Sequence, residues 1–233
     1  MKKLIISILV LAGFCTVASA GVGVKVGVSA QIGSMETSGK EVSSDGTTQT
    51  AATEEALFGT GGYFIEKDLA FLPSRLGVIG SRIHIGYDTI AHDLDLGTQT
   101  NVRVDPVLKG VGEQTENEDY SLNAKVTGFE TIYATINITD WLYVKAGEVT
   151  VDVKTKFSGS TTSSYPENHS LDGTMVGFGV AKTSDSGLFF RLEYNDYSID
   201  GKSVVNAGAG SKFTSTLNDV SGSTGRISIG KAF

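Results

Sequence analysis

The dominant pattern along this chain is strict alternation of apolar and polar residues, which is the period of a β-strand. Residues 188–199, for example, place Leu188 and Leu192 on one face and Arg191 and Glu193 on the other. Eight such runs follow one another: residues 21–33, 56–66, 76–90, 121–138, 141–156, 171–182, 188–199 and 222–233. After residue 20, no long stretch shows the helical spacing of apolar residues. The pattern predicts an all-β chain.

The connections between these runs alternate in length. The long ones are polar and rich in Gly, Ser, Thr and Asp, and cover residues 34–55, 91–120, 157–170 and 200–221. The short ones are residues 67–75, 139–140 and 183–187. Long loops outside, short turns inside and an even number of strands are typical of bacterial outer-membrane barrels, whereas a soluble meander has no reason to keep such a pattern. Eight strands would leave both chain ends on the periplasmic side.

The N-terminal segment reads as a secretory signal peptide over residues 1–20. Lys2 and Lys3 precede a short apolar core, and Ala18 and Ala20 supply the small residues of a cleavage site. The apolar core is too short to span a bilayer, which takes about 20 apolar residues. The mature chain is then expected to cover residues 21–233.

The last run ends on an aromatic residue. Ile227, Ile229 and Phe233 share one face of it. A terminal aromatic residue on such a strand resembles the signal that the outer-membrane assembly machinery recognises. Lys231 departs from that pattern, because an apolar or aromatic residue usually stands there; its stem can reach the membrane edge.

In its layout the mature region resembles the small bacterial outer-membrane β-barrels of the OmpA/OmpX and opacity-protein type. The resemblance implies a closed antiparallel up-and-down transmembrane β-barrel, most simply of eight strands, although ten also fit. It implies the outer membrane of a Gram-negative bacterium, in contact with its lipids and lipopolysaccharide. It also implies the barrel domain alone. Closure suits the physics, because a membrane-spanning sheet must leave no unpaired edge in lipid.

Composition and charge narrow the function. The chain has 19 Lys and Arg against 26 Asp and Glu, a net charge of −7, which argues against nucleic acid as a partner. A single Cys excludes a disulfide scaffold and Cys-rich metal sites. The acidic residues gather in the long loops, which would favour a cationic extracellular partner or divalent ions. Nothing in the sequence identifies that partner, and we expect no cofactor.

In a barrel, the polar face of each strand lines the lumen. Charges of both signs fall on these faces, and they predict a polar network of ion pairs that fills the lumen. The expected members, besides Lys25, are Arg82, His84, Asp88, Lys125, Lys145, Arg191, Glu193 and Arg226. The alternative interpretation of the same residues is a narrow ion path.

One residue does not fit simple alternation. Between Leu122 and Ile138 the alternation points Glu130 toward lipid, where a charge is costly. We expect either a bulge at Gly128 that turns Glu130 inward and Phe129 outward, or a position of Glu130 above the hydrocarbon.

Candidate catalytic and metal-binding residues are sparse. His84 falls four residues before Asp88 on the same face, and His169-Ser170 follows Glu167, but neither spacing matches a known nucleophile and base arrangement. Carboxylates in the second long loop could attract a hard cation, but without a liganding motif they are expected to form a solvated acidic loop: Asp93, Asp95, Glu113, Glu116, Glu118 and Asp119. We therefore predict no catalytic and no metal site.

The leading hypothesis is a non-enzymatic outer-membrane protein with a structural or surface role, including adhesion or recognition through residues 34–55 and 91–120. The alternatives are a narrow ion or small-solute channel, a lipid-modifying enzyme, and a soluble periplasmic barrel that binds a ligand in an apolar interior.

Overall fold

The computed structural model describes residues 23–43, 48–71, 80–104, 117–159, 168–205 and 213–233. These residues form eleven strands: β1 (Val24–Ser43), β2 (Thr48–Asp68), β3 (Ile83–Ile90), β4 (Leu94–Val104), β5 (Asn117–Asn137), β6 (Leu142–Gly159), β7 (Asn168–Thr183), β8 (Leu188–Ile199), β9 (Lys202–Val205), β10 (Phe213–Leu217) and β11 (Val220–Ala232). In the described part of the chain no helix is long and apolar enough to cross a membrane.

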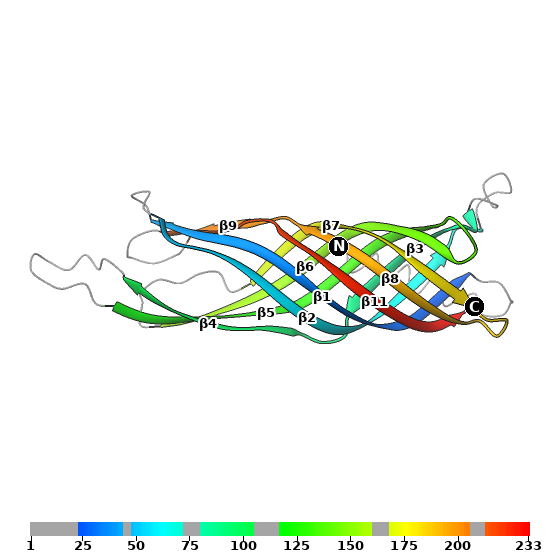
Figure 1. Ribbon diagram of the computed structural model, residues 1–233, viewed down its shortest axis with the longest axis horizontal. Coiled ribbons are helices and arrows are strands. Elements are labelled where there is room, and N and C mark those ends of the chain that lie inside the picture. Colours follow the sequence, from blue (N-terminus) through cyan, green and yellow to red (C-terminus); the bar gives the residue numbers. More distant parts are fainter. Residues whose placement is uncertain (1–22, 44–47, 72–79, 105–116, 160–167, 206–212) are drawn as a thin grey trace, which may run out of the picture.

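Eight of these strands close into a ring. Each pairs antiparallel with its neighbours in the order β1-β2-β3-β5-β6-β7-β8-β11, and β11 pairs back onto β1. The elongated barrel is seen from the side in Figure 1. This confirms the closed, eight-stranded, up-and-down barrel that the alternating pattern predicts. The other three strands extend the wall at one end: β4 continues along β5, and β10 pairs with both β1 and β9.

The segments expected as long loops contain much more strand than the sequence suggests. The β1–β2 hairpin is paired as far as Val42 and Thr48, inside the range 34–55. β4 and the start of β5 lie inside 91–120, and β9 and β10 lie inside 200–221. In a hairpin, backbone pairing can continue beyond the alternating core, and polar Thr- and Ser-rich strands carry it here. These ranges are therefore not simple loops, which corrects the expected boundaries.

In the part of the barrel near the C-terminal residue Phe233, the distribution of polar and apolar residues is the reverse of that in a soluble protein. Apolar residues on its outer face are exposed, as Phe190 (54 %) and Ile227 (49 %) are, while Arg191 and Asn195 (0 %) are buried inside. Burying polar groups and exposing large apolar ones is costly in water. It is the arrangement expected where lipid surrounds the wall.

Farther along the same strands, the outward residues become polar and the inward residues become apolar. On β8 the outward residues change from Leu192 and Tyr194 to Asp196 and Ser198, and the inward ones become Tyr197 and Ile199. The burial pattern keeps strict alternation from end to end of this strand. The strand therefore keeps its direction while its two faces exchange polarity. We call the part of the barrel between Phe233 and the level of Tyr194 the lower storey, and the part from Asp196 upward the upper storey.

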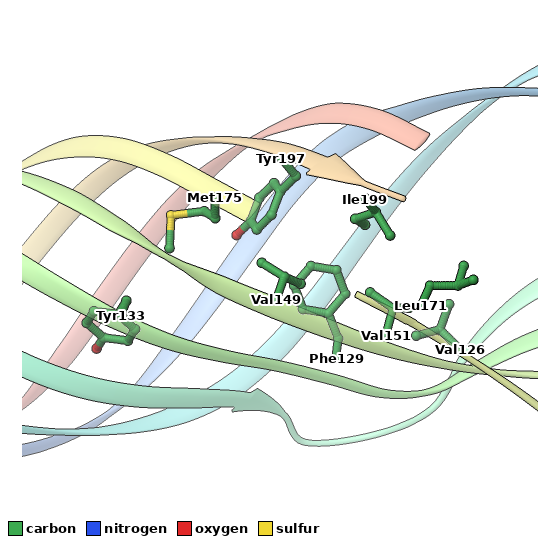
Figure 2. Packing of buried hydrophobic residues seen from close by; sticks show 9 residues of the cluster. All are labelled: Val126, Phe129, Tyr133, Val149, Val151, Leu171, Met175, Tyr197 and Ile199. Atoms are coloured by element: carbon green, nitrogen blue, oxygen red, sulfur yellow. The ribbon is translucent and has the colours of Figure 1, made fainter. Parts of the chain in front are cut away.

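The upper storey has an apolar interior. The buried cluster comprises Val126, Phe129, Tyr133, Val149, Val151, Leu171, Met175, Tyr197 and Ile199. Tyr133 forms its lower border, where its hydroxyl meets Glu66 of the lower storey. The Phe129 and Tyr197 rings meet edge to face with centroids 5.4 Å apart, and Figure 2 shows them beside Val149 inside the wall. On β6 the outward neighbours of this cluster are polar, namely Thr150, Asp152 and Lys154. The upper storey is thus built like a small water-soluble barrel.

A bulge accounts for the strand that did not fit alternation. The β5–β6 register shifts between Val126 and Gly128, as expected near Gly128. Its consequence differs from our expectation, because Phe129 points inward and is 5 % exposed. Glu130 stays on the outer face, opposite Thr150 of β6 and Thr89 of β3. The expectation that the bulge turns Glu130 inward is therefore wrong. Glu130 lies where the residues of the outer face are already polar.

Candidate functional site: a charged lumen under an apolar cap

The lower lumen holds a compact set of buried charges. Its members are inward residues of five strands: Glu66 on β2, Asp88 on β3, Lys145 on β6, Arg191 and Glu193 on β8, and Arg226 on β11. Each lies on the polar side of an alternating strand, so closure of the ring brings all six together. Burial of a charge is tolerated only where a partner compensates it, and each of the six has one.

The tightest contact joins Glu66 and Arg191. The Arg191 guanidinium donates from both terminal nitrogens to the two Glu66 carboxylate oxygens, each at 2.6 Å. The Tyr133 hydroxyl donates to the same carboxylate at 2.9 Å. The guanidinium also lies over the Phe64 and Tyr143 rings, 5.1 and 5.2 Å from their centroids. A bidentate, stacked guanidinium of this kind is held more rigidly than a surface pair.

The remaining charges extend this pair across the lumen. Asp88 accepts from Arg226 at 2.7 Å and from Lys145 at 3.2 Å. Glu193 lies 3.6 Å from the Lys145 ammonium and 3.5 Å from the Arg226 guanidinium. It also lies 4.0 Å from Arg191. Positive and negative groups therefore alternate from Glu66 through to Asp88, and the network crosses the space through which an ion would have to pass.

Glycine makes room for the aromatic ring at the centre of this network. A Cβ at Gly86 would lie 2.4 Å from Cζ of Tyr133, and one at Gly147 would lie 2.7 Å from its Cβ. The Tyr133 ring therefore occupies the space that a side chain at position 86 would fill, while Gly147 lies against the base of the same side chain. Lys145 places its ammonium 3.8 Å from the centre of the same ring. The lack of a side chain at Gly86 leaves room for the Tyr133 ring, whose hydroxyl reaches Glu66.

Of the nine predicted members, Lys25 and His84 contact each other at the lower end of the lumen. Five lie in the network itself: Asp88, Lys145, Arg191, Glu193 and Arg226. Two do not, and these expectations are corrected. Lys125 is exposed on the outer face and pairs with Asp95 at 3.4 Å, because the bulge beyond Val126 reverses the parity of β5. Arg82 lies just before β3, exposed, with its guanidinium 3.4 Å from the Ile138 carbonyl.

Sequence reasoning missed Glu66 and Tyr133. Glu66 closes an alternating run and is followed by Lys67 and Asp68, so it resembles the start of a polar turn. Its spacing from Thr60, also inward, is the signal that could have identified it. Tyr133 reads as the polar partner of outward Ile132, but nothing local indicates that its hydroxyl reaches a carboxylate on another strand.

The candidate catalytic residues are not assembled into a catalytic group. His84 is buried at the lower end of the lumen, and its Nε2 lies 3.2 Å from the Lys25 ammonium. Asp88 is engaged with Arg226 and Lys145 instead. His169 lies in β7, and Glu167 is outside the described residues. Among the residues that the structure describes, no group of three or more His, Cys, Asp or Glu could hold a metal ion.

The carboxylates of the second long connection are placed only in part. Asp93 is exposed, and Asp95 lies in β4 beside Lys125 and Asn123. Glu118 and Asp119 belong to β5. Glu113 and Glu116 lie outside the described residues, as do the cleavage-site residues Ala18 and Ala20 with the whole of residues 1–20.

The C-terminal residues close the wall. Ile227 and Ile229 lie on the outer face of β11, and Phe233 beyond it is exposed as well. The Phe233 amide donates to the Val24 carbonyl at 2.8 Å, which ties the end of the chain to the first strand. Lys231 donates to the Ser186 carbonyl in the neighbouring turn. The departure from the usual apolar residue at position 231 thus supplies a contact between two adjoining strand ends.

Comparison with known proteins supports the barrel fold. No protein-family model matches the sequence, and no curated protein matches it. Among solved structures, the outer membrane protease OmpT of Escherichia coli superposes with a TM-score of 0.50 at 8 % identity, covering 94 % of this chain and 99 % of that one. Ail of Yersinia pestis, the attachment invasion locus protein, reaches 0.29 at 11 % identity over 86 % and 98 %. A FadL homologue of Pseudomonas aeruginosa reaches 0.33 at 8 % over 90 % of each.

The chain therefore has the fold of a bacterial outer-membrane β-barrel. At 8 % identity the likeness to OmpT extends to the fold alone. The narrower assignment to the OmpA/OmpX or opacity type stays a prediction.

Proposed function

We propose that this protein is an integral outer-membrane barrel of a Gram-negative bacterium with a structural and surface role. Its lower storey would be the membrane anchor, and its upper storey would present β-structure to the medium for recognition. The observation that carries the proposal is the blocked lumen: six buried charges pair with one another across it, and a buried apolar cluster lies above them.

The exchange of face polarity supports this placement. A charged residue on the lipid side of a barrel costs about 2–4 kcal/mol at the midplane and much less near the interface. The outward series on β8 changes from Tyr194 to Asp196, and on β6 from Ala146 to Glu148. These positions would mark the outer surface of the membrane. The short turn Ser184–Gly187 and the C-terminal residue Phe233 would then face the periplasm. Lipid and lipopolysaccharide would surround the lower storey. The outer-membrane assembly machinery would act on the chain during biogenesis.

The same arrangement argues against conduction. An ion crossing the lower lumen would have to displace buried pairs such as Arg191 with Glu66, and it would then meet an apolar interior that binds no ion. The six charged groups of the lower lumen are likewise ion-paired with one another rather than aimed at an open site. This supports a non-enzymatic role over a lipid-modifying one.

Single-channel recording in planar bilayers tests the proposal. We expect a closed trace at all voltages for the purified protein, with a porin in the same bilayer as the positive control. Reproducible conductance steps from the barrel would contradict the sealed lumen. Mobility of unboiled and boiled samples on detergent gels, run in parallel, shows that the recorded protein is a folded barrel.

A second measurement addresses catalysis. Envelope lipid composition is compared among wild type, a gene deletion, and the variants His84→Ala and His169→Ala. We expect all four to match. A lipid change in the deletion that either histidine variant reproduces would favour an enzyme.

A further inference from the structure

Above the closed ring, the wall divides into two groups of strands. The β2–β3 ladder ends at Gly62 and Ile90. Beyond it β4 pairs with β5, so that β9-β10-β1-β2 form one wing and β4-β5-β6-β7 form the other. The two wings separate toward the left of Figure 1. Two seams therefore run up the upper storey, one between β2 and β4 and one between β7 and β9.

The two seams differ in the hydrogen bonds that cross them. Across the β7–β9 seam, the Asp200 amide donates to the Asp172 carbonyl at 2.8 Å and the Lys202 ammonium donates to the Ser170 carbonyl at 3.3 Å. At the β2–β4 seam, among the residues described, the Ala91 amide donates to the Gly61 carbonyl at 2.9 Å, at its base. Above that point, β1 is the one strand among the described residues that pairs with β2.

The direction of the open backbone groups follows from that basal bond. The Gly61 carbonyl points to the seam, and alternate residues of an antiparallel strand direct their backbone groups to the same edge. The β1–β2 register is regular from Gly61 up to Thr50. The amides and carbonyls of Thr53, Glu55 and Leu57 therefore point into the seam. Such a row of backbone groups is a template for pairing with another extended chain.

The side chains along this edge indicate what kind of chain would fit. Thr53 through Leu57 are all exposed, and Leu57 is 85 % exposed. Glu54 and Glu55 are consecutive in the strand, so their side chains point to opposite faces of the sheet. Glu36 of β1 is paired directly with Glu55. Like charges in register are unfavourable on their own. A cationic neighbour on the open side would offset that repulsion.

We propose that the β2 edge from Thr53 to Leu57 binds an extended segment of a partner protein, added to the sheet as a further strand and carrying adjacent Lys or Arg residues. Backbone pairing to the edge would supply affinity, and the two basic residues would supply specificity, one toward Glu54 and one toward Glu55. A second copy of this chain fits poorly, because antiparallel β2–β2 pairing would bring these glutamates against each other. The proposal rests on the proposed function, since it requires that the upper storey face the medium.

The edge is tested by binding of a fluorescent peptide to the full chain in lipid nanodiscs. The probe is a short peptide of alternating Thr and Val with a central Lys-Arg pair, and its control carries Glu-Glu instead. In the edge variant Thr53→Pro/Leu57→Pro, proline removes two amides that point into the seam, a change that edge strands tolerate. Thr53→Ala/Leu57→Ala is the matched control, and gel mobility of unboiled samples verifies folding.

We expect the basic peptide to bind wild type and the alanine variant within twofold of each other, and the proline variant at least tenfold more weakly. Glu54→Lys/Glu55→Lys should reverse the preference between the two peptides. Peptide binding should also slow hydrogen exchange of the Thr53, Glu55 and Leu57 amides. Equal binding to the proline variant, no preference for the basic peptide, or no binding at all would overturn the proposal. Self-association of wild type that the proline variant loses would assign the edge to a second copy instead.

Labelling separates failure of this proposal from failure of the proposed function. Lys40→Cys, at an exposed position in the upper storey, is treated in intact cells with a membrane-impermeant maleimide. Labelling without peptide binding overturns the edge site alone. Absence of labelling in intact cells, with labelling after lysis, contradicts the surface placement on which both depend.

Discussion

Arg191 on β8 and Glu66 on β2 are 125 residues apart in the sequence and form a bidentate ion pair with both bonds at 2.6 Å inside the barrel. On its own strand Arg191 has Glu193 at 4.0 Å, whereas the two short hydrogen bonds come from Glu66 on another strand. The pair therefore depends on ring closure, and it ties the stability of the lower storey to the correct register of all eight strands.

Removing one partner of this pair should be strongly destabilising. Arg191→Ala leaves the Glu66 carboxylate buried with Tyr133 as its remaining hydrogen-bond donor, and loss of a buried partner costs about 3–5 kcal/mol. Urea unfolding in detergent micelles measures the change. Arg82→Ala, at an exposed arginine, serves as the control and should lie within about 0.5 kcal/mol of wild type. Equal effects of the two substitutions would mean that the lumen tolerates an unpaired carboxylate.

The corrected place of Lys125 gives a second prediction. Lys125→Ala should cost about 0–1 kcal/mol, as expected for an exposed pair, because its partner Asp95 lies with it on the outer surface. Lys145→Ala, on the inner face, should cost about 3–5 kcal/mol, because Asp88 and Glu193 both lose a partner. The comparison uses the same unfolding assay. A large effect of Lys125→Ala would return this residue to the lumen.

The barrel should require glycine at position 86, because a larger side chain would collide with Tyr133. In Gly86→Ala the new methyl group would lie 2.4 Å from the Tyr133 ring, and overpacking of this kind costs about 1–3 kcal/mol. Gly225→Ala is the matched control, because nothing lies within 4 Å of a Cβ there. The unfolding midpoint should fall for Gly86→Ala and hold for Gly225→Ala. Tyr133→Leu in the Gly86→Ala background should recover part of the steric loss, since the shorter side chain vacates the contact.

The exchange of face polarity predicts opposite responses from neighbouring positions of β6. Val149 is 1 % exposed in the apolar cluster, and Thr150 is on the outer face. Val149→Asp would bury an unpaired carboxylate and should prevent the barrel from reaching its heat-modifiable form, whereas Thr150→Asp should leave gel mobility unchanged. Val149→Ile keeps the apolar character and tests whether size alone matters. Tolerance of Val149→Asp would contradict an apolar upper interior.

Much of this architecture follows from local patterns. The alternation in residues 188–199 predicts a strand with two distinct faces, and the structure has it throughout β8. The expected turns at 139–140 and 183–187 are present, with the Ile138 amide donating to the Leu142 carbonyl and the Ser184 amide to the Leu188 carbonyl. Alternation and tight turns are short-range, so they are legible in the sequence.

Only part of the candidate site could be predicted from the sequence. Arg191, Glu193 and Asp88 could be placed in the lumen from parity alone, because no irregularity separates them from the rest of their strands. Lys125 could not, since one bulge reverses the parity of every residue beyond it. Glu66 was missed because a charge at the end of a run resembles a turn.

By itself, the sequence determined the period of the strands, their approximate number, and an apolar and a polar face for each. Those properties depend on residue spacing within a strand. Only the tertiary structure decided which charges meet, where the two faces exchange polarity, and which strand edges stay open above the ring. These depend on register and closure, because hydrogen bonding across eight strands sets the height of each residue relative to residues far away in the chain.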